Sequence, residues 1–274
     1  MTSEASYPKG DLMAGKRGLI MGVANDHSIA WGIAQALHAQ GAELAFTYQG
    51  EAFGRRVTPL AESVGASIVE PCNVDSEEDL ERVFGRLEKE WGKIDFVVHA
   101  IAYSDKSELT GYYLNTSRQN FRHTVAISAY SFTAVARHAR ALMTDGGGLL
   151  TLTYLGAERV TPNYNVMGVA KAALEASVRY LAMDLGEEGI RVNALSAGPM
   201  RTLAGSAIGA AKFVYRWTGS QAPLHRNPQL DEVGRAGLYL LSDLASGVTG
   251  EIHHVDGGYH AVGIPHPKRM DPED

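Results

Sequence analysis

"GVANDHSIAWG" spans residues 22–32 and lies between a short apolar run and a segment with helical periodicity. The run Leu19–Met21 is typical of a buried β-strand and the helical pattern begins at Ile29, so the stretch is a strand-to-helix turn. In a nucleotide-binding protein such a turn usually has the sequence GxGxxG. Here the middle glycine is missing, and six residues separate Gly22 from Ile29. The question is whether this longer turn can bind a nucleotide as a GxGxxG turn does.

The rest of the chain alternates strand-like and helix-like segments. Several strand candidates are near-continuous apolar runs, which is typical of a parallel sheet covered by helices on both faces. This alternation predicts a Rossmann-like α/β fold, a doubly wound parallel sheet flanked by helices. We expect strands at 17–23, 43–48, 67–70, 94–100, 149–154, 190–195 and 251–255, and helices at 29–40, 51–64, 76–91, 118–143, 164–186 and 231–242.

Composition narrows the partners and the compartment. The formal net charge of −6 argues against nucleic acid as a partner, and no apolar stretch is long enough to span a membrane. Residues 1–16 lack the apolar core of a secretory signal. Cys72 is the only cysteine, so neither an internal disulfide nor a cysteine-based metal cluster can form. We therefore expect a soluble, cytoplasmic protein.

Three residues of the opening turn have properties that a phosphate site needs. Gly22 ends the first strand, where only glycine lets the backbone approach a phosphate closely. Ser28 precedes the helix, so that its hydroxyl can cap the helix and, with the first helical amides, favour an anion. Gly32 permits close packing of this helix on a strand. A plain turn before a helix has the same features, so both interpretations stay open at this point.

Longer stretches carry a specific resemblance. The chain resembles the bacterial NADH-dependent enoyl-acyl-carrier-protein reductases in GKRGLIMGVANDHSIAWGIAQAL, GAELAFTYQGE, DFVVHAIAYSD, LLTLTYLGAERVTPNYNVMGVAKAALEASVRYLA, GIRVNALSAGPMRTLAGSAI and SGVTGEIHHVDGGY. These enzymes are a divergent branch of the short-chain dehydrogenase/reductases, and the resemblance covers residues 15–260. It implies that a long serine-containing turn replaces GxGxxG, and that the protein reduces trans-2-enoyl thioesters in the last reductive step of fatty acid elongation. With it we expect a flexible leader at 1–14, a single dinucleotide-binding reductase domain at 15–262 and a C-terminal tail at 263–274.

Two tyrosines and a lysine are the expected catalytic residues. Ordinary short-chain dehydrogenases have a lysine four residues after the catalytic tyrosine, but that position after Tyr164 is Gly168. Lys171 instead follows Tyr164 by seven residues, nearly two helical turns, so both side chains share a face about 10 Å apart along the axis. This spacing resembles the family's Tyr-x6-Lys motif. Hydride addition to an enoyl thioester leaves negative charge on the thioester oxygen, which the Tyr164 phenol would stabilise.

The resemblance gives Lys171 and Tyr154 supporting roles. Lys171 would bind the hydroxyls of the nicotinamide ribose, and its charge would favour the electron-rich transition state. Tyr154 lies at the end of the fifth strand, where it would line the acyl pocket. Whether it positions the substrate or relays a proton stays open.

The cofactor contacts carry over from the family position by position. Gln49 follows the second strand, where a dinucleotide protein reads the ribose 2′-hydroxyl, and it is neither an acid nor a base. The family prefers NADH, which we expect here, while Arg55 and Arg56 leave NADPH open. Asn73 replaces the family's usual aspartate beside adenine, and Ala102 replaces a common glycine. The expected contacts are Gly22, Ser28, Ile29, Gln49, Asn73, Val74, Ile101, Lys171, Met200, Thr202 and Ala204.

The segment SAIGAAKFVYRW is the expected substrate-binding lid helix over the acyl chain. Without the resemblance, a surface helix packed on the core would be favoured. Its inward face would consist of Ile208, Ala211, Phe213 and Tyr215, with Lys212 and Arg216 outside. The expected substrate contacts are Ser104, Tyr154, Ile208 and Phe213.

Charge is distributed unevenly near the lid. No acidic residue occurs between Glu188 and Asp231, although the chain has 31 of them. A local positive field of this kind steers acidic partners, and acyl carrier protein is such a partner. We expect docking contributions from Lys212, Arg216 and Arg226; attraction of the cofactor's phosphates is the rival explanation.

Two other functions compete with enoyl reduction. A short-chain ketone or 3-oxoacyl reductase shares the fold, but the missing Tyr-x3-Lys and the pair Tyr154 and Tyr164 argue against it. A nucleotide-binding protein without catalysis is disfavoured because Tyr164 and Lys171 are both present. We expect no catalytic metal, because the ten histidines occur in no ligand motif. Members of that family form homotetramers, so the resemblance implies a homotetramer here.

Overall fold

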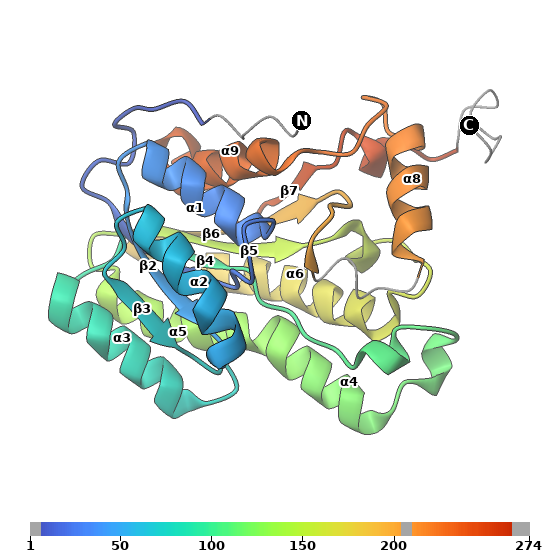
Figure 1. The fold of residues 1–274 in the computed structure, drawn as a ribbon, viewed down its shortest axis with the longest axis horizontal. Helices are drawn as coiled ribbons and strands as arrows, with labels where there is room; N and C mark the ends of the chain where they lie inside the picture. Colours follow the sequence, from blue (N-terminus) through green and yellow to red (C-terminus); the bar gives the residue numbers. More distant parts are fainter. Residues whose placement is uncertain (1–6, 204–209, 265–274) are drawn as a thin grey trace.

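The computed structural model describes residues 7–203 and 210–264, and a parallel sheet of seven strands forms its centre (Figure 1). The strand order is β3-β2-β1-β4-β5-β6-β7, so the direction of winding reverses between β1 and β4. This order confirms the expected doubly wound α/β fold. The strands are β1 (Arg17–Met21), β2 (Glu43–Tyr48), β3 (Ile68–Pro71), β4 (Phe96–His99), β5 (Gly147–Thr153), β6 (Ile190–Ala197) and β7 (Ile252–Val255).

Helices cover both faces of the sheet. Helices α1, α2 and α9 pack on one face, and α3, α5 and α6 on the other (Figure 1). None of the described helices is long and apolar enough to cross a membrane. The helix expected over 118–143 is present as α4 and α5, with a π-helical segment, Ala126–Tyr130, between them. The helices are α1 (Ile29–Ala39), α2 (Glu51–Ser63), α3 (Glu77–Trp91), α4 (Arg118–Val125), α5 (Ser131–Leu142), α6 (Asn165–Leu185), α8 (Ala211–Gln221) and α9 (Leu230–Leu241).

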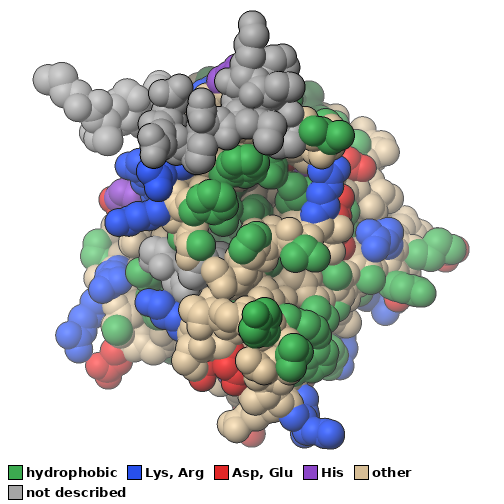
Figure 2. Space-filling view, turned by 90° about the vertical axis from the view of Figure 1, so that its right-hand side faces the viewer, with side chains coloured by type: hydrophobic (Ala, Val, Ile, Leu, Met, Phe, Trp, Pro, Cys, Tyr) green, Lys and Arg blue, Asp and Glu red, His purple; other side chains and the backbone are tan. Residues whose placement is uncertain are grey.

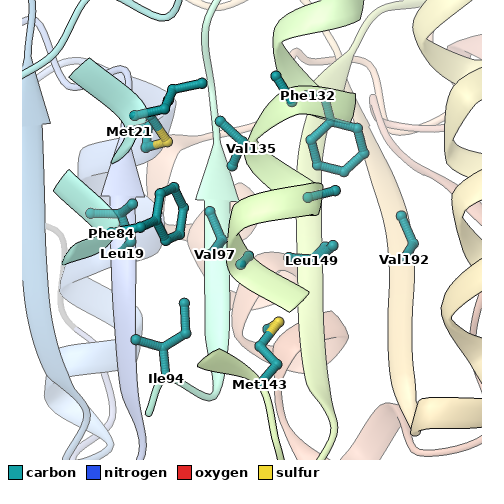
Figure 3. Close-up of a cluster of buried hydrophobic side chains, with 14 of the residues drawn as sticks. Leu19, Met21, Phe84, Ile94, Val97, Phe132, Val135, Met143, Leu149 and Val192 are labelled. Carbon is teal, nitrogen blue, oxygen red and sulfur yellow. The ribbon is translucent and has the colours of Figure 1, made fainter. Parts of the chain in front are cut away.

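The central strands contribute to two hydrophobic cores, one on each face of the sheet. Successive side chains of a strand point to opposite faces, so Leu19 and Met21 lie in one core and Ile20 in the other. Phe84 of α3 and Phe132 of α5 cover the first core (Figure 3). Burial on both faces explains why these strands are apolar throughout, without the polar alternation of a half-exposed sheet.

Gly32 of α1 lies against α9, which corrects one expectation. A Cβ atom at Gly32 would lie 2.7 Å from Leu230 Cδ1, and one at Gly234 would lie 2.5 Å from the Gly32 carbonyl oxygen. The expectation that Gly32 permits packing on a strand was therefore wrong. The two glycines instead allow a close helix–helix contact.

Residues 7–14 of the expected leader lie along the end of α1. The Gly10 N–H donates to the Ala39 carbonyl (3.0 Å), the Met13 N–H donates to the Gln40 carbonyl (2.8 Å), and the Met13 side chain is buried. This part of the chain is therefore held to the domain. The domain boundaries stay a prediction, because both chain ends lie outside the described residues.

Candidate active site

The residues expected to form the site lie at the carboxyl edge of the sheet. Doubly wound proteins bind ligands at this edge where the strand order reverses, here at the ends of β1 and β4. Gly22 follows β1 with φ +97°, and a Cβ atom there would overlap the Ala100 carbonyl oxygen that follows β4. The approach of the two strand ends therefore requires glycine at position 22.

Ser28 is the N-cap residue of α1, as expected, but its hydroxyl points back into the turn. Its Oγ accepts from the Ala24 N–H (3.0 Å) and the Asn25 N–H (3.1 Å). The expectation that this hydroxyl caps the helix was wrong, because the long turn supplies closer amides. The serine stabilises the turn itself. The first amides of α1 have no intrahelical acceptor, as in any helix, and they suit an anion.

Tyr154 and Tyr164 are in contact just beyond β5. Their ring centroids are 5.1 Å apart, and the rings meet edge to face at 75°. Gly156 makes room for them, because a Cβ there would lie 2.8 Å from Tyr164 Cε1. Burial raises the pKa of both phenols, and Tyr154 and Glu175 raise that of Tyr164 further. Tyr164 is therefore a neutral hydrogen-bond donor at physiological pH.

Lys171 of α6 is a buried cation seven residues after Tyr164, the N-cap residue of that helix, with 6% of its surface exposed. Its Nζ donates to the Leu152 carbonyl of β5 at 2.7 Å. Among the described residues this is its one acceptor, so two N–H donors remain for ligand hydroxyls. Burial lowers the pKa of Lys171 to about 8, against the opposing charge of Glu175. The lysine therefore stays mostly charged at neutral pH.

The π-helical segment fixes the loop that follows β4. Ser128 of this segment is buried, and its Oγ accepts from the Tyr103 N–H (3.0 Å) and donates to the Tyr103 carbonyl (3.1 Å). The same loop carries Ile101, half-buried, and Ala102, exposed, where the resemblance expects the nicotinamide. Sequence reasoning missed Ser128, because a π-helix is a one-residue widening that helical periodicity does not show.

His99 ends β4 inside the core, and it belongs to no potential metal-binding cluster of His, Cys, Asp and Glu among the described residues. Its Nε2 lies 2.8 Å from Ser131 Oγ and its Nδ1 lies 3.2 Å from Thr151 Oγ1. Burial, and then the charge of Lys171, lower the pKa of His99 to about 3. The imidazole is therefore neutral at physiological pH.

The residues expected at the adenine end lie along the same edge of the sheet. Gln49 follows β2 and is exposed, and Asn73 follows β3 and is exposed beside half-buried Val74. Asn73 Oδ1 accepts from the Asp75 N–H at 3.2 Å, so the amide shapes its own turn. These positions are open to a ligand, and their roles stay predictions.

The segment after β6 is described up to residue 203 and again from residue 210. Met200 is half-buried and packs against the core on the face of the sheet that α1, α2 and α9 cover, and its carbonyl accepts from the Thr202 N–H (2.9 Å). Ala204 and Ile208 lie outside the described residues.

Helix α8 forms where the lid is expected, with a different buried face. Its buried residues are Thr218 and Gln221. Phe213 is 50% exposed and stacks on Trp217, with ring centroids 6.0 Å apart. Phe213, expected on an inner face, is therefore not covered by the rest of the described chain.

Ser104 lies in a polar network that joins its loop to α4. Its Oγ accepts from Thr124 Oγ1 (2.9 Å) and from Asn120 Nδ2 (3.1 Å), and Asn120 Nδ2 also donates to Glu108. Ser104 thus helps to fix the loop, and its predicted contact with substrate stays a prediction. The network had no sequence signal, because these partners lie 16 and 20 positions from Ser104.

The basic residues of the acid-free interval divide into paired and exposed ones. Arg191 donates to backbone carbonyls near the end of α9. Arg226 binds both carboxylate oxygens of Glu232 at 2.6 and 2.7 Å, so its charge is balanced locally. On the side of the molecule that carries α8, Lys and Arg side chains flank apolar ones (Figure 2). The exposed cations of α8 are Lys212 and Arg216.

A doubly wound sheet, with Tyr164 as the N-cap residue of α6 and Lys171 within that helix, is typical of the short-chain dehydrogenase/reductase class. Within that class, the chain belongs to the enoyl-acyl-carrier-protein reductase family, since the model described as Enoyl-(Acyl carrier protein) reductase matches residues 22–260.

Individual relatives agree with this placement. The chain is 64% identical over 253 residues to enoyl-acyl-carrier-protein reductase 1 of Rhizobium meliloti, whose name specifies NADH; the match covers 92% of this chain and 93% of that protein. The Anaplasma phagocytophilum reductase in complex with NAD has a TM-score of 0.92 at 58% identity, covering 95% of this chain and all 100% of that one. The Bacillus cereus reductase with NADP+ and an indole naphthyridinone has a TM-score of 0.91 at 52% identity, covering 93% and 100%. The family expected from the sequence is thus confirmed.

Proposed function

We propose that this chain reduces the 2,3-double bond of trans-2-enoyl thioesters on acyl carrier protein, with NADH, as the last reductive step of fatty acid elongation. The observation that carries the proposal is the buried Tyr164 phenol, seven residues before the buried ammonium of Lys171 and edge-on to Tyr154. The relatives named for this activity match most of the chain and support it.

The carboxyl edge of the sheet fits a dinucleotide. Gly22 places no side chain between the turn and a ligand, and the first amides of α1 suit a pyrophosphate. Lys171 retains two donors for ribose hydroxyls. Gln49 lies where the 2′-hydroxyl is read in this fold, so NADPH is the second cofactor to test.

The side chains then act as follows. NADH supplies a hydride when bound. The Tyr164 phenol donates a hydrogen bond to the thioester oxygen as negative charge develops there. Lys171 orients the ribose and adds positive charge to the site. Tyr154 restricts the rotation of the Tyr164 ring through their edge-to-face contact and lines the acyl path.

The test follows the loss of reduced-nicotinamide absorbance, with NADH and NADPH in turn. The paired substrates are a trans-2-enoyl and a 3-oxoacyl thioester, and the variant is Tyr164→Phe. We expect turnover of the enoyl substrate only, with kcat lowered about 100-fold or more in the variant. Turnover of the oxo substrate only would make the protein a ketoreductase, and no turnover of either would favour a binding protein without catalysis.

For the carrier protein we propose docking on Lys212 and Arg216 of α8. Both side chains are exposed. Arg226, which was also expected to contribute to docking, is not included here because it forms an ion pair with Glu232. Reversing the charge of Lys212 and Arg216 should raise KM for the carrier-linked substrate more than for the coenzyme A thioester. Equal changes for both substrates would contradict docking at α8.

We also propose a cytoplasmic homotetramer. Exposed apolar side chains on α6, Tyr180 (76%) and Met183 (82%), support contact with another copy. A single cysteine, Cys72, is compatible with a reducing compartment. Light scattering coupled to size exclusion tests the assembly, and cell fractionation tests the location; a monomer or a membrane-bound fraction would contradict them.

A further inference from the structure

Glu175 is a buried acid to which the mechanism above assigns no role. It lies on α6 one helical turn after Lys171, with only 6% of its surface exposed. Glutamate is almost never buried to this extent without a partner. Its position therefore calls for a physical reason.

Glu175 and Lys171 are held to consecutive residues of the same strand. Glu175 Oε1 accepts from Thr153 Oγ1 at 2.6 Å, and Lys171 Nζ donates to the Leu152 carbonyl at 2.7 Å. Tyr154 is the next residue along the chain. Because residues four apart share a helix face, both charged side chains reach the strand end that leads into the tyrosine pair.

Of the charged groups that influence the pKa of Lys171, Glu175 is the anion. Burial lowers the pKa of Lys171, and among the described residues Glu175 is the charged group that raises it. On the β4 side, His99 is neutral, because burial and the charge of Lys171 lower its pKa. The Tyr164 phenol is neutral as well, since burial raises its pKa.

The pKa of Glu175 is raised on balance, chiefly by burial and further by Glu158 in the turn after Tyr154. The Thr153 hydroxyl, Arg179 of α6 and His254 of β7 lower it. A hydroxyl donor and two basic residues thus favour the carboxylate, which is the form that can balance an ammonium.

We propose that Glu175 is a positioning residue that supplies the counter-charge of Lys171 and keeps its ammonium at the strand end beside Tyr154. The proposal rests on the function proposed above. Without the carboxylate, the buried ammonium loses the negative charge that raises its pKa and releases its proton at a lower pH. A neutral Lys171 brings no positive charge to the transition state, so Glu175 acts through the lysine.

Glu175→Gln tests this role, because glutamine keeps the shape and still accepts from Thr153. Asp184→Asn is the matched control, since it removes one acid from an exposed position of the same helix. The first readout is an NMR titration of cofactor-free protein with 13Cε-labelled lysine, in which Lys171→Arg identifies the Lys171 signal. The second is the pH dependence of kcat/KM for an enoyl thioester with NADH.

We expect Glu175→Gln to lower the midpoint of the Lys171 titration by about one pH unit or more. The basic limb of kcat/KM moves with it, and Asp184→Asn moves neither. An unmoved midpoint, with kcat/KM reduced equally at every pH, would show that Glu175 is merely structural and would overturn the proposal.

Two further results keep the test decisive. If Glu175→Gln does not fold, Glu175→Asp retains the charge; a Lys171 midpoint close to that of the wild type supports the proposal, and a fall of about one unit contradicts it. If the wild-type protein does not reduce the enoyl thioester, the proposed function fails. The NMR titration still decides whether Glu175 controls the charge of Lys171.

Discussion

Replacing Gly22 with alanine should destabilise the protein by about 2–5 kcal/mol, as the sum of two effects. The backbone has φ +97°, a conformation that costs a residue with a Cβ atom about 1–2 kcal/mol. The added Cβ would also overlap the Ala100 carbonyl oxygen and lie 3.1 Å from Ala100 Cα. The two strand ends are joined by the Ala100 N–H···Met21 carbonyl bond at 3.0 Å, so relief requires strand movement and costs a further 1–3 kcal/mol or so.

The assay is differential scanning calorimetry of Gly22→Ala beside Gly65→Ala. Gly65 has φ +71° and no atom within 4 Å of its added Cβ, so it carries the backbone effect alone. At about 2 °C per kcal/mol for a chain of this length, Tm should fall by roughly 4–10 °C in Gly22→Ala and 2–4 °C in the control. Saturating NADH should raise Tm of the control and not of Gly22→Ala, because the turn meets the ligand. Equal shifts of Tm in the two variants would refute the argument from close approach.

Three more predictions concern buried groups of the site. Lys171→Met should lose activity and also lose a pH dependence of stability, since burial lowers the Lys171 pKa to about 8 and the unfolded chain binds the proton more tightly. The wild type gains up to about 3 kcal/mol between pH 8 and 10.5 that the variant does not gain; urea unfolding at pH 8 and 10.5 measures this difference, and parallel changes would contradict it. The wild type should lose about 1 kcal/mol of stability per pH unit below 6.5 through His99, because its pKa in the folded protein is lowered to about 3 and only the unfolded chain takes up the proton. His99→Gln should not show this loss. Urea unfolding at pH 6.5 and 4.5 measures the difference, and an equal loss of stability in both proteins would contradict it. Gly156→Ala should lower kcat about tenfold or more, because the added Cβ forces the Tyr164 ring aside. The loss of stability should stay below about 3 kcal/mol. An unchanged kcat in a folded variant would contradict this.

The sheet was predictable from the sequence because burial on two faces leaves a strong local signal. Strand β2 begins and ends at the expected residues, and the strand expected at 94–100 is present in shortened form as Phe96–His99. The helix that carries Lys171 was equally readable from its periodicity, but Tyr164 is the N-cap residue of α6, and Asn165 after it has φ +44°. The face that Tyr164 and Lys171 were expected to share therefore stays a prediction.

The details of the site depend on contacts between elements, and these had no comparable signal. The hydrogen bonds between Ser128 and Tyr103 join residues 25 positions apart, and the hydrogen bond between Thr153 and Glu175 joins residues 22 positions apart. Arg226 was expected to contribute to docking, but it forms an ion pair with Glu232, which lies just beyond the acid-free interval. A charge count along the chain cannot show such pairing, because it depends on side-chain direction.

The inward hydroxyl of Ser28 has a consequence for affinity. The seven-residue connection between β1 and α1 would lose conformational freedom if it became ordered only on meeting its ligand, and that entropy would weaken binding. Ser28 ties the Ala24 and Asn25 amides together in the protein alone. The ordering is thus completed during folding, and the turn is preorganised for a dinucleotide. Ser28→Ala should therefore slow association and weaken binding, because it frees the Ala24 and Asn25 amides before the ligand arrives.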